Sequence, residues 1–134
     1  MGIFSEYVAE IEEVFIEGDG RFDLKVDEVL NYQKYLNFLS GRWLKNGSNR
    51  ELIAKLHYEN LNPKDNKAIR VVVNGGTVGY LSCEDARLFR ERLEKVGREG
   101  LIVSCHAMAI GGKRTWFFNK TDFDVCLDLP IEKL

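Results

Sequence analysis

The sequence contains few residues of the kinds that build covalent or metal cross-links. Only three cysteines and two histidines occur among its 134 residues. An odd number of widely spaced cysteines, with no C-x-x-C pair, argues against a disulfide framework and against a zinc cage. We therefore expect a protein of the reducing cytoplasm that binds no metal and no cofactor.

Long hydrophobic runs and catalytic motifs with known mechanics are missing as well. Apolar runs such as residues 101–105 are far shorter than the roughly 20 residues of a membrane-spanning helix, so we expect no membrane association. The sequence has no nucleophile elbow, no H-E-x-x-H motif, no Walker loop and no dinucleotide fingerprint. Cys105 and His106 are neighbours on an expected strand and point to opposite faces, so they cannot easily share a proton. These absences predict a protein that is not an enzyme.

The composition that remains is typical of one globular domain. Hydrophobic residues make up 45% of the chain and charged residues 30%, and a chain of this length can bury one core. Residues 1–28 hold nine acidic and two basic side chains, which leaves twelve acidic and seventeen basic ones in residues 29–134. An acidic segment beside a basic body is compatible with a surface that binds a polyanion, although ordinary surface solvation explains it equally well.

Residues 1–20 predict an acidic amphipathic helix. Apolar residues recur there at three- and four-residue intervals, glutamates fill much of the rest, and Gly18-Asp19-Gly20 ends the pattern. The apolar positions are Ile3, Phe4, Tyr7, Val8, Ile11, Val14 and Phe15. A stripe this wide is too apolar to leave in water, so we expect it to pack on the domain formed by residues 21–134 or on a second copy of the chain.

Residues 21–134 predict an α+β domain with five to six strands and two to three helices. Strands are expected at 22–26, 52–58, 101–110 and from 117 or 121 to 129, where apolar and polar residues alternate. Residues 69–81 predict a hairpin around Asn74-Gly75-Gly76, and a helix is expected from 29 to about 40. Elements of this kind favour a small closed or half-closed β-barrel, OB-like or SH3-like.

A further helix is expected from Ser82, as its cap, to Val96. Its predicted buried stripe consists of Ala86, Phe89, Leu93 and Val96. The opposite face, with Arg87 and Arg90 among mixed charges, predicts a solvated surface. The aspartates Asp122, Asp124 and Asp128 are expected on a solvated strand face.

One stretch of the sequence resembles a known family. Asn62-Pro63-Lys64-Asp65 is followed by Ala68-Ile69-Arg70-Val71, by Val78-Gly79-Tyr80-Leu81-Ser82 and by Ala86-Arg87. Together with Tyr32-Gln33 and the closing Val125-x-Leu-Asp-Leu, this order resembles the HIRAN domain, a module found in front of certain SWI/SNF-type DNA-dependent ATPases and, alone or fused, in bacteria. Residues 1 to about 21 lie outside the match.

The resemblance implies an OB-like barrel that binds the 3′ end of single-stranded DNA and works with a helicase or nuclease partner. Carried over by position, Tyr32 would stack on a terminal base, Asn62 would shape its loop or bond the sugar, and Asp65 would contact the 3′ hydroxyl. An ionised carboxylate accepts a hydrogen bond from a hydroxyl but repels a phosphate.

Two positions depart from the family, and they leave alternatives open. Lys64 and Lys67 stand where an aromatic residue and an asparagine are usual. With Arg70, these lysines would neutralise phosphate instead. The chain is therefore either a DNA-binding module or a protein-interaction adaptor whose barrel has lost DNA binding. An unrecognised hydrolase is the weakest hypothesis.

The motif residues also have purely structural interpretations. Asn62-Pro63 and Asp65 form a good turn on their own. Tyr32 and Tyr80 could be core aromatics.

Overall fold

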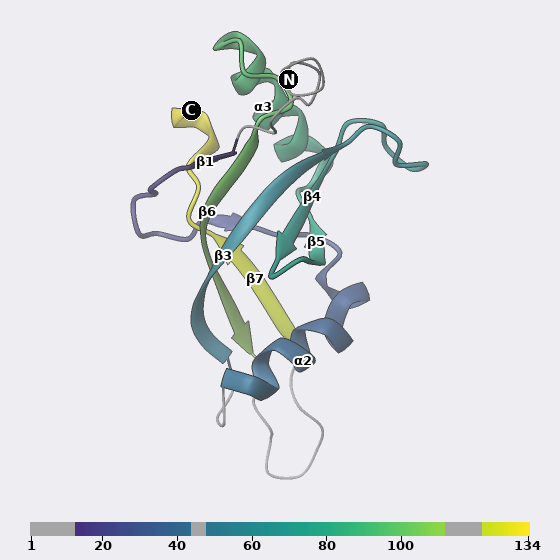
Figure 1. Ribbon diagram of the computed structural model, residues 1–134, viewed down its shortest axis with the longest axis vertical. Helices are drawn as coiled ribbons and strands as arrows, with labels where there is room; N and C mark the ends of the chain where they lie inside the picture. The colour runs from purple at the N-terminus through teal and green to yellow at the C-terminus, as the bar shows by residue number, and fades with distance from the viewer. Residues whose placement is uncertain (1–12, 44–47, 112–121) are drawn as a thin grey trace, which may run out of the picture.

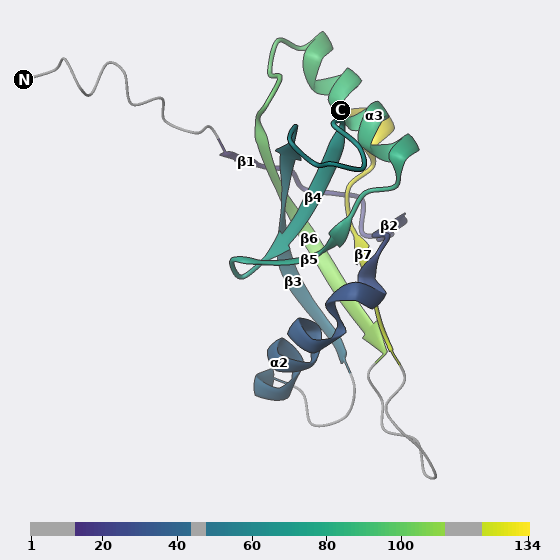
Figure 2. The same cartoon turned by 90° about the vertical axis from the view of Figure 1, so that its right-hand side faces the viewer.

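The computed structural model describes residues 13–43, 48–111 and 122–134. Within these ranges one curled sheet has a helix near each end (Figure 1, Figure 2). The helices are α2 (Gln33–Trp43) and α3 (Cys83–Lys95). A 3-10 turn, η1 (Val29–Tyr32), leads into α2, and a second, η2 (Ile131–Lys133), packs beside α3. The predicted α+β class is confirmed.

Among the described residues the sheet has seven strands, and six of them follow the order β2-β7-β6-β3-β4-β5. All neighbours along this path are antiparallel. The strands are β2 (Leu24–Lys25), β3 (Ser48–Glu59), β4 (Ala68–Val73), β5 (Gly76–Tyr80), β6 (Ile102–Gly111) and β7 (Phe123–Leu127). In Figure 1 the long strands β3 and β6, with the shorter β7 beside β6, run through the middle of the molecule, between α3 at one end and α2 at the other.

The two edges of this path meet directly after β2. Val26 donates its backbone N–H to the carbonyl of Val125 in β7 over 3.0 Å. The next residue, Asp27, exchanges two backbone hydrogen bonds with Tyr80 of β5, with N···O distances of 2.7 and 3.0 Å. The sheet therefore curls back on itself, which is compatible with the small barrel that the sequence predicts.

The predicted hairpin is confirmed in β4 and β5. Asn74 and Gly75 at its turn both have positive φ, 54° and 83°, as a two-residue turn matched to the strand twist requires. Tyr35 of α2 covers this turn, because its hydroxyl donates to the carbonyl of Val73 over 2.7 Å and its ring lies where a Cβ on Gly76 would stand. These contacts hold α2 against the hairpin tip.

Helix α3 begins as predicted, and its last residue and buried stripe need one correction. The Ser82 hydroxyl accepts the backbone N–H of Asp85 over 3.0 Å, and Gly97, with φ 71°, follows the last turn. The prediction that Val96 is buried is wrong, because the side chain is 60% exposed. The α-helix ends one residue earlier, so Val96 leaves the buried stripe.

The core fills the inside of the curled sheet, under both helices. Side chains alternate along the strands, so those of β3, β6 and β7 that face inward are buried while most of their neighbours are not; Ser104 of β6 is an exception at 5% exposed. The largest fully buried side chains are Phe89, Leu56, Ile69, Leu127, Val26, Val71, Val78, Val103, Val125 and Cys105. This core fixes the positions of the strand ends around which the loops are built.

The predicted N-terminal helix is wrong where the structure describes it. Glu13–Phe15 form a strand, β1, that pairs in parallel with β6, and residues 16–20 are not helical. The first residues of β6 extend beyond its pairing with β7, so their backbone groups are available to another strand. Ile16 donates its N–H to one of these groups, the Ser104 carbonyl, over 2.8 Å. Residues 1–12, with most of the predicted stripe and oligomer contact, lie outside the described residues.

Two further expectations near the chain ends need correction. The strand predicted at 22–26 shortens to β2, because Phe22 takes a left-handed conformation with φ 52°. Asp128 is not solvated but only 4% exposed, and both of its carboxylate oxygens accept the backbone N–H of Gly20 at 3.0 Å. The alternation of β7 ends at Leu127, so it does not place Asp128 outside.

In the part of the chain that the structure describes, neither helix has the combination of length and apolar character that a bilayer crossing requires.

Candidate functional site

A pocket of about 460 Å³ lies where the loop after β3, the η1 turn, the end of β5 and the start of α3 meet. Its volume is in the range of small-molecule sites, which run from about 300 to 1,000 Å³. Its aromatic and charged lining residues are Glu28, Tyr32, Glu59, Lys64, Asp65 and Tyr80. The pocket therefore combines residues from three separate stretches of the chain, 28–32, 59–68 and 80–83.

Two tyrosines supply the aromatic part of this lining. The ring centroids of Tyr32 and Tyr80 lie 6.5 Å apart, with the rings tilted by 46°. The Tyr80 hydroxyl donates to Oε1 of Glu59 over 2.8 Å. Burial and the Glu59 carboxylate raise the pKa of Tyr80, so its hydroxyl stays protonated as a donor. Both rings are half-buried, and neither belongs to the fully buried core.

Asn62 organises the loop that follows β3. Its Oδ1 accepts the backbone N–H groups of Lys64 and Asp65 at 2.9 and 3.2 Å, which is the Asx-turn that asparagine favours at such positions. Its Nδ2 donates to Oε1 of Glu59 over 2.7 Å. The side chain is therefore used within the protein, in agreement with the loop-shaping role expected from sequence.

The Asp65 carboxylate is held by two neighbours. Oδ1 accepts the backbone N–H of Lys67 over 3.0 Å, and both oxygens accept from the Arg87 guanidinium, each over 3.2 Å. The Lys67 amide and the Arg87 guanidinium hold the pKa of this carboxyl below its usual range. Asp65 thus remains ionised, and it ties the loop to α3.

Arg90 of α3 binds the same loop at its two ends. Its guanidinium donates to Oδ1 of Asn60 over 2.8 Å and to the carbonyls of Lys67 and Ala68 over 2.7 and 2.9 Å. The guanidinium also lies over the Tyr58 ring, 4.3 Å from its centroid. The face of α3 that the sequence predicts to be solvated therefore holds the loop with Arg87 and Arg90.

Four of the six site residues predicted from sequence line this one pocket: Tyr32, Asn62, Lys64 and Asp65. Arg70 reaches it indirectly, because its Nε lies 3.0 Å from Oε2 of Glu59. Lys67 lies on the same loop with an exposed side chain and is not part of the lining.

Sequence reasoning missed Glu59 and Glu28 as lining residues. One signal for Glu59 was present, because it stands three residues before Asn62 at the end of a strand, within reach of that turn. The charged groups of the lining are three carboxylates, Glu28, Glu59 and Asp65, and one ammonium, Lys64. The lining taken alone is therefore net negative, and two of its carboxylates, Glu59 and Asp65, pair with arginines outside it, Arg70 and Arg87.

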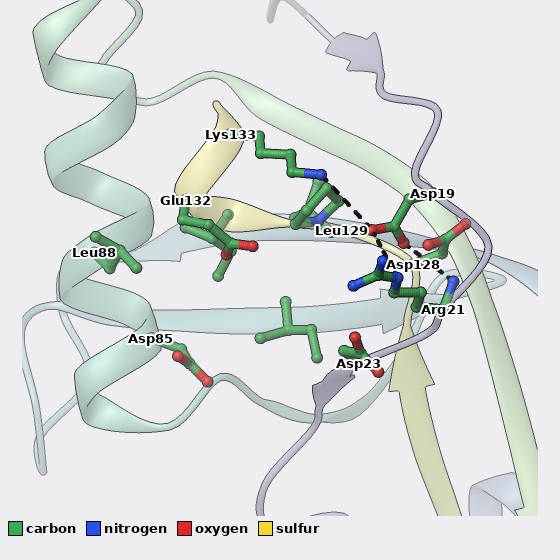
Figure 3. Close-up of a pocket in the computed structure, with 12 residues that line it drawn as sticks. Asp19, Arg21, Asp23, Asp85, Leu88, Asp128, Leu129, Glu132 and Lys133 are labelled. Atoms are coloured by element: carbon green, nitrogen blue, oxygen red, sulfur yellow. Dashed lines mark hydrogen bonds and ion pairs between the residues drawn. The ribbon is translucent and has the colours of Figure 1, made fainter.

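A second pocket, of about 280 Å³, lies between α3, η2 and the segment that follows β1 (Figure 3). Asp85 and Leu88 project into it from α3, and Lys133 and Asp19 face each other across it. Asp19 pairs with Arg21 and Lys133 at 3.8 and 4.0 Å, so both cations of this pocket have a partner in its own wall. None of the site residues predicted from sequence lines it.

Among the described residues, no group of three or more His, Cys, Asp or Glu side chains is arranged to hold a metal ion. Comparison with known proteins found no matching family model, no matching curated protein and no matching solved structure.

Proposed function

We propose that this chain is a non-enzymatic module with an OB-like barrel that binds the 3′-hydroxyl end of single-stranded DNA in the larger pocket. The observation that carries the proposal is the convergence of Tyr32 with Asn62, Lys64 and Asp65. Tyr32 stands about thirty positions before the other three residues in the sequence. The HIRAN resemblance assigns all but Lys64 to one DNA end. Their meeting in one pocket supports a shared site for the DNA end.

The chemistry of the lining suits a hydroxyl end better than a phosphate end. Aromatic faces stack on bases with little regard to sequence, at about 1 to 3 kcal/mol per base. Carboxylates accept a hydrogen bond from a free hydroxyl, whereas a terminal phosphate would place two like charges together. Lys64, which is exposed, would neutralise an internucleotide phosphate near the end.

A module of this kind acts by bringing another protein to the DNA end. A free 3′ end is a position where a helicase or nuclease starts. We propose that the chain guides such an enzyme, joined to it or bound by it.

A second candidate function is a protein-interaction adaptor, and the acidic lining favours it. A lysine or arginine side chain placed between Tyr32 and Tyr80 would gain cation–π attraction from the rings and charge attraction from Glu28, Glu59 and Asp65. The two candidates thus share a pocket and differ in the charge of the ligand.

Fluorescence anisotropy separates them. The full chain is titrated into three labelled ligands: a thymidine oligonucleotide of roughly ten nucleotides with a 3′ hydroxyl, the same strand with a 3′ phosphate, and a lysine-rich peptide of similar length. DNA-end binding predicts tightest binding of the 3′-hydroxyl strand. Binding of the peptide alone would support the adaptor and overturn the DNA proposal.

A further inference from the structure

Glu59 is the carboxylate on which the pocket is built. It is the last residue of β3, and its Oε1 accepts from Nδ2 of Asn62 over 2.7 Å and from the Tyr80 hydroxyl over 2.8 Å. Its Oε2 lies 3.0 Å from Nε of Arg70. One side chain therefore positions the loop, one aromatic ring and the nearest guanidinium.

Asp65, which the family resemblance assigns to the 3′ hydroxyl, is the less accessible of the two carboxylates, because its side chain is 18% exposed against 28% for that of Glu59. A carboxylate offers about four lone-pair sites. At Asp65 the Lys67 amide and the two Arg87 nitrogens occupy three of them.

Glu59 retains capacity on the oxygen that faces Arg70. Its Oε1 has two donors, whereas its Oε2 has the single contact with Arg70. The side chain is 28% exposed, and the residue lines the pocket. A hydroxyl in the pocket can therefore reach an accepting oxygen at Glu59 without breaking a contact within the protein.

The ion pair between Glu59 and Arg70 also neutralises a cation that would otherwise bind phosphate. Arg70 is held by Glu59 at Nε and donates from Nη1 to the Thr77 hydroxyl over 3.1 Å. Its positive charge is thus offset where a terminal phosphate would approach. Without the Glu59 charge, Arg70 would become a phosphate-binding group of the kind expected from sequence.

We infer that Glu59, and not Asp65, is the residue that selects a 3′ hydroxyl over a 3′ phosphate, by accepting the hydroxyl proton and by neutralising Arg70. This inference rests on the proposed function. It leaves to Asp65 the role of holding its own loop on α3 through Arg87.

The test compares Glu59→Gln with Asp65→Asn in the full chain, by anisotropy with the 3′-hydroxyl and 3′-phosphate strands. The glutamine keeps the size of the side chain but removes the charge that holds Arg70. We expect the ratio of the two affinities to fall about tenfold in Glu59→Gln, chiefly because phosphate ends bind better. We expect Asp65→Asn to keep the wild-type ratio while its thermal midpoint falls. A wild-type ratio in Glu59→Gln, or loss of the preference in Asp65→Asn, overturns the inference.

Arg70→Gln provides a second measurement that does not depend on the folding of Glu59→Gln. Removing Arg70 leaves the Glu59 charge without its partner, so the hydroxyl preference should sharpen, and an unchanged or weaker preference overturns the inference. If wild type binds neither strand, the proposed function itself fails, an outcome distinct from a measurable preference that these variants leave unchanged.

Discussion

The Asp65 carboxylate lies in the wall of the pocket and binds the loop that carries it. Its contacts with the Lys67 amide and with Arg87 are the kind that lower a carboxyl pKa, and the pKa of Asp65 is indeed lowered from the usual value of 3.8. A residue placed by a sequence motif can therefore serve the shape of the site and not its ligand. This distinction leads to a prediction at the scale of the residue.

Asp65→Asn should make the free energy of unfolding less dependent on pH in the acid range. The folded state has the lower pKa, so the stabilisation is present above the unfolded value of about 3.8 and disappears as the pH falls through the folded pKa. We expect wild type to exceed the variant in free energy of unfolding at pH 7 and the difference to shrink below about pH 4. Urea denaturation at several pH values measures it.

The matched control is Asp124→Asn, an exposed carboxylate of β7. Its difference from wild type should be small at every pH. A stability difference at Asp65 that stays constant from pH 7 to acid would show that the carboxylate charge does not hold the loop.

Between elements, α3 fixes the loop that follows β3. Arg87 and Arg90 stand one helical turn apart on the same face, and they bind the loop at Asp65 and at Asn60, Lys67 and Ala68 respectively. A loop held in this way presents its lining residues in one conformation, which reduces the ordering cost of binding.

Arg90→Met should loosen this loop while leaving the helix intact. Methionine matches the aliphatic stem of arginine and its helix propensity but donates no hydrogen bonds. We expect a loss of about 1 to 3 kcal/mol in the free energy of unfolding and faster hydrogen exchange in residues 60–68. Lys95→Met, which breaks the exposed pair with Glu91, is the control and should cost under about 0.5 kcal/mol. Equal effects of the two substitutions would contradict the role of Arg90.

Local elements could be predicted from the sequence because their signals are local. The alternation of apolar and polar residues predicted β3 and β7. The Asn74-Gly75 turn predicted the hairpin, and the Ser82 cap predicted the start of α3. The contacts of Glu59, Arg87 and Arg90 could not be predicted in the same way, because they join residues that only the folded barrel brings together.

The errors have the same origin. A run of apolar and acidic residues suits a helix, but in residues 13–15 it meets the open edge of β6, and tertiary pairing overrides the local pattern. The charge of Asp128 suggests exposure, but the turn at Gly18 and Gly20 closes over it.

At the scale of the whole molecule, the pocket lies beside the Asp27–Tyr80 bridge, where the sheet curls back on itself. Tyr80 belongs both to this backbone pairing and to the pocket, because its backbone hydrogen-bonds to Asp27 and the residue lines the pocket. Ligand binding and the closure of the sheet are therefore expected to be coupled through the same residue.

Saturating 3′-hydroxyl DNA should raise the stability of the barrel as a whole. A ligand that binds only the folded state adds about 2.7 kcal/mol at a free concentration about 100-fold above its Kd. We expect the melting temperature to rise with ligand concentration and the amides of Asp27 and Tyr80 to exchange more slowly. A melting temperature that does not move at saturation would exclude this coupling.

The central claim, that this pocket receives the DNA end, is tested most directly by following backbone amide resonances by NMR during titration with the 3′-hydroxyl oligonucleotide. The account predicts that the largest shifts fall on Tyr32, Lys64, Asp65 and Tyr80, and that the same strand with a 3′ phosphate produces smaller ones. Shifts concentrated around Asp19, Asp85 and Lys133 of the second pocket, or the same shifts at Tyr32 and Tyr80 with both strands, would contradict it.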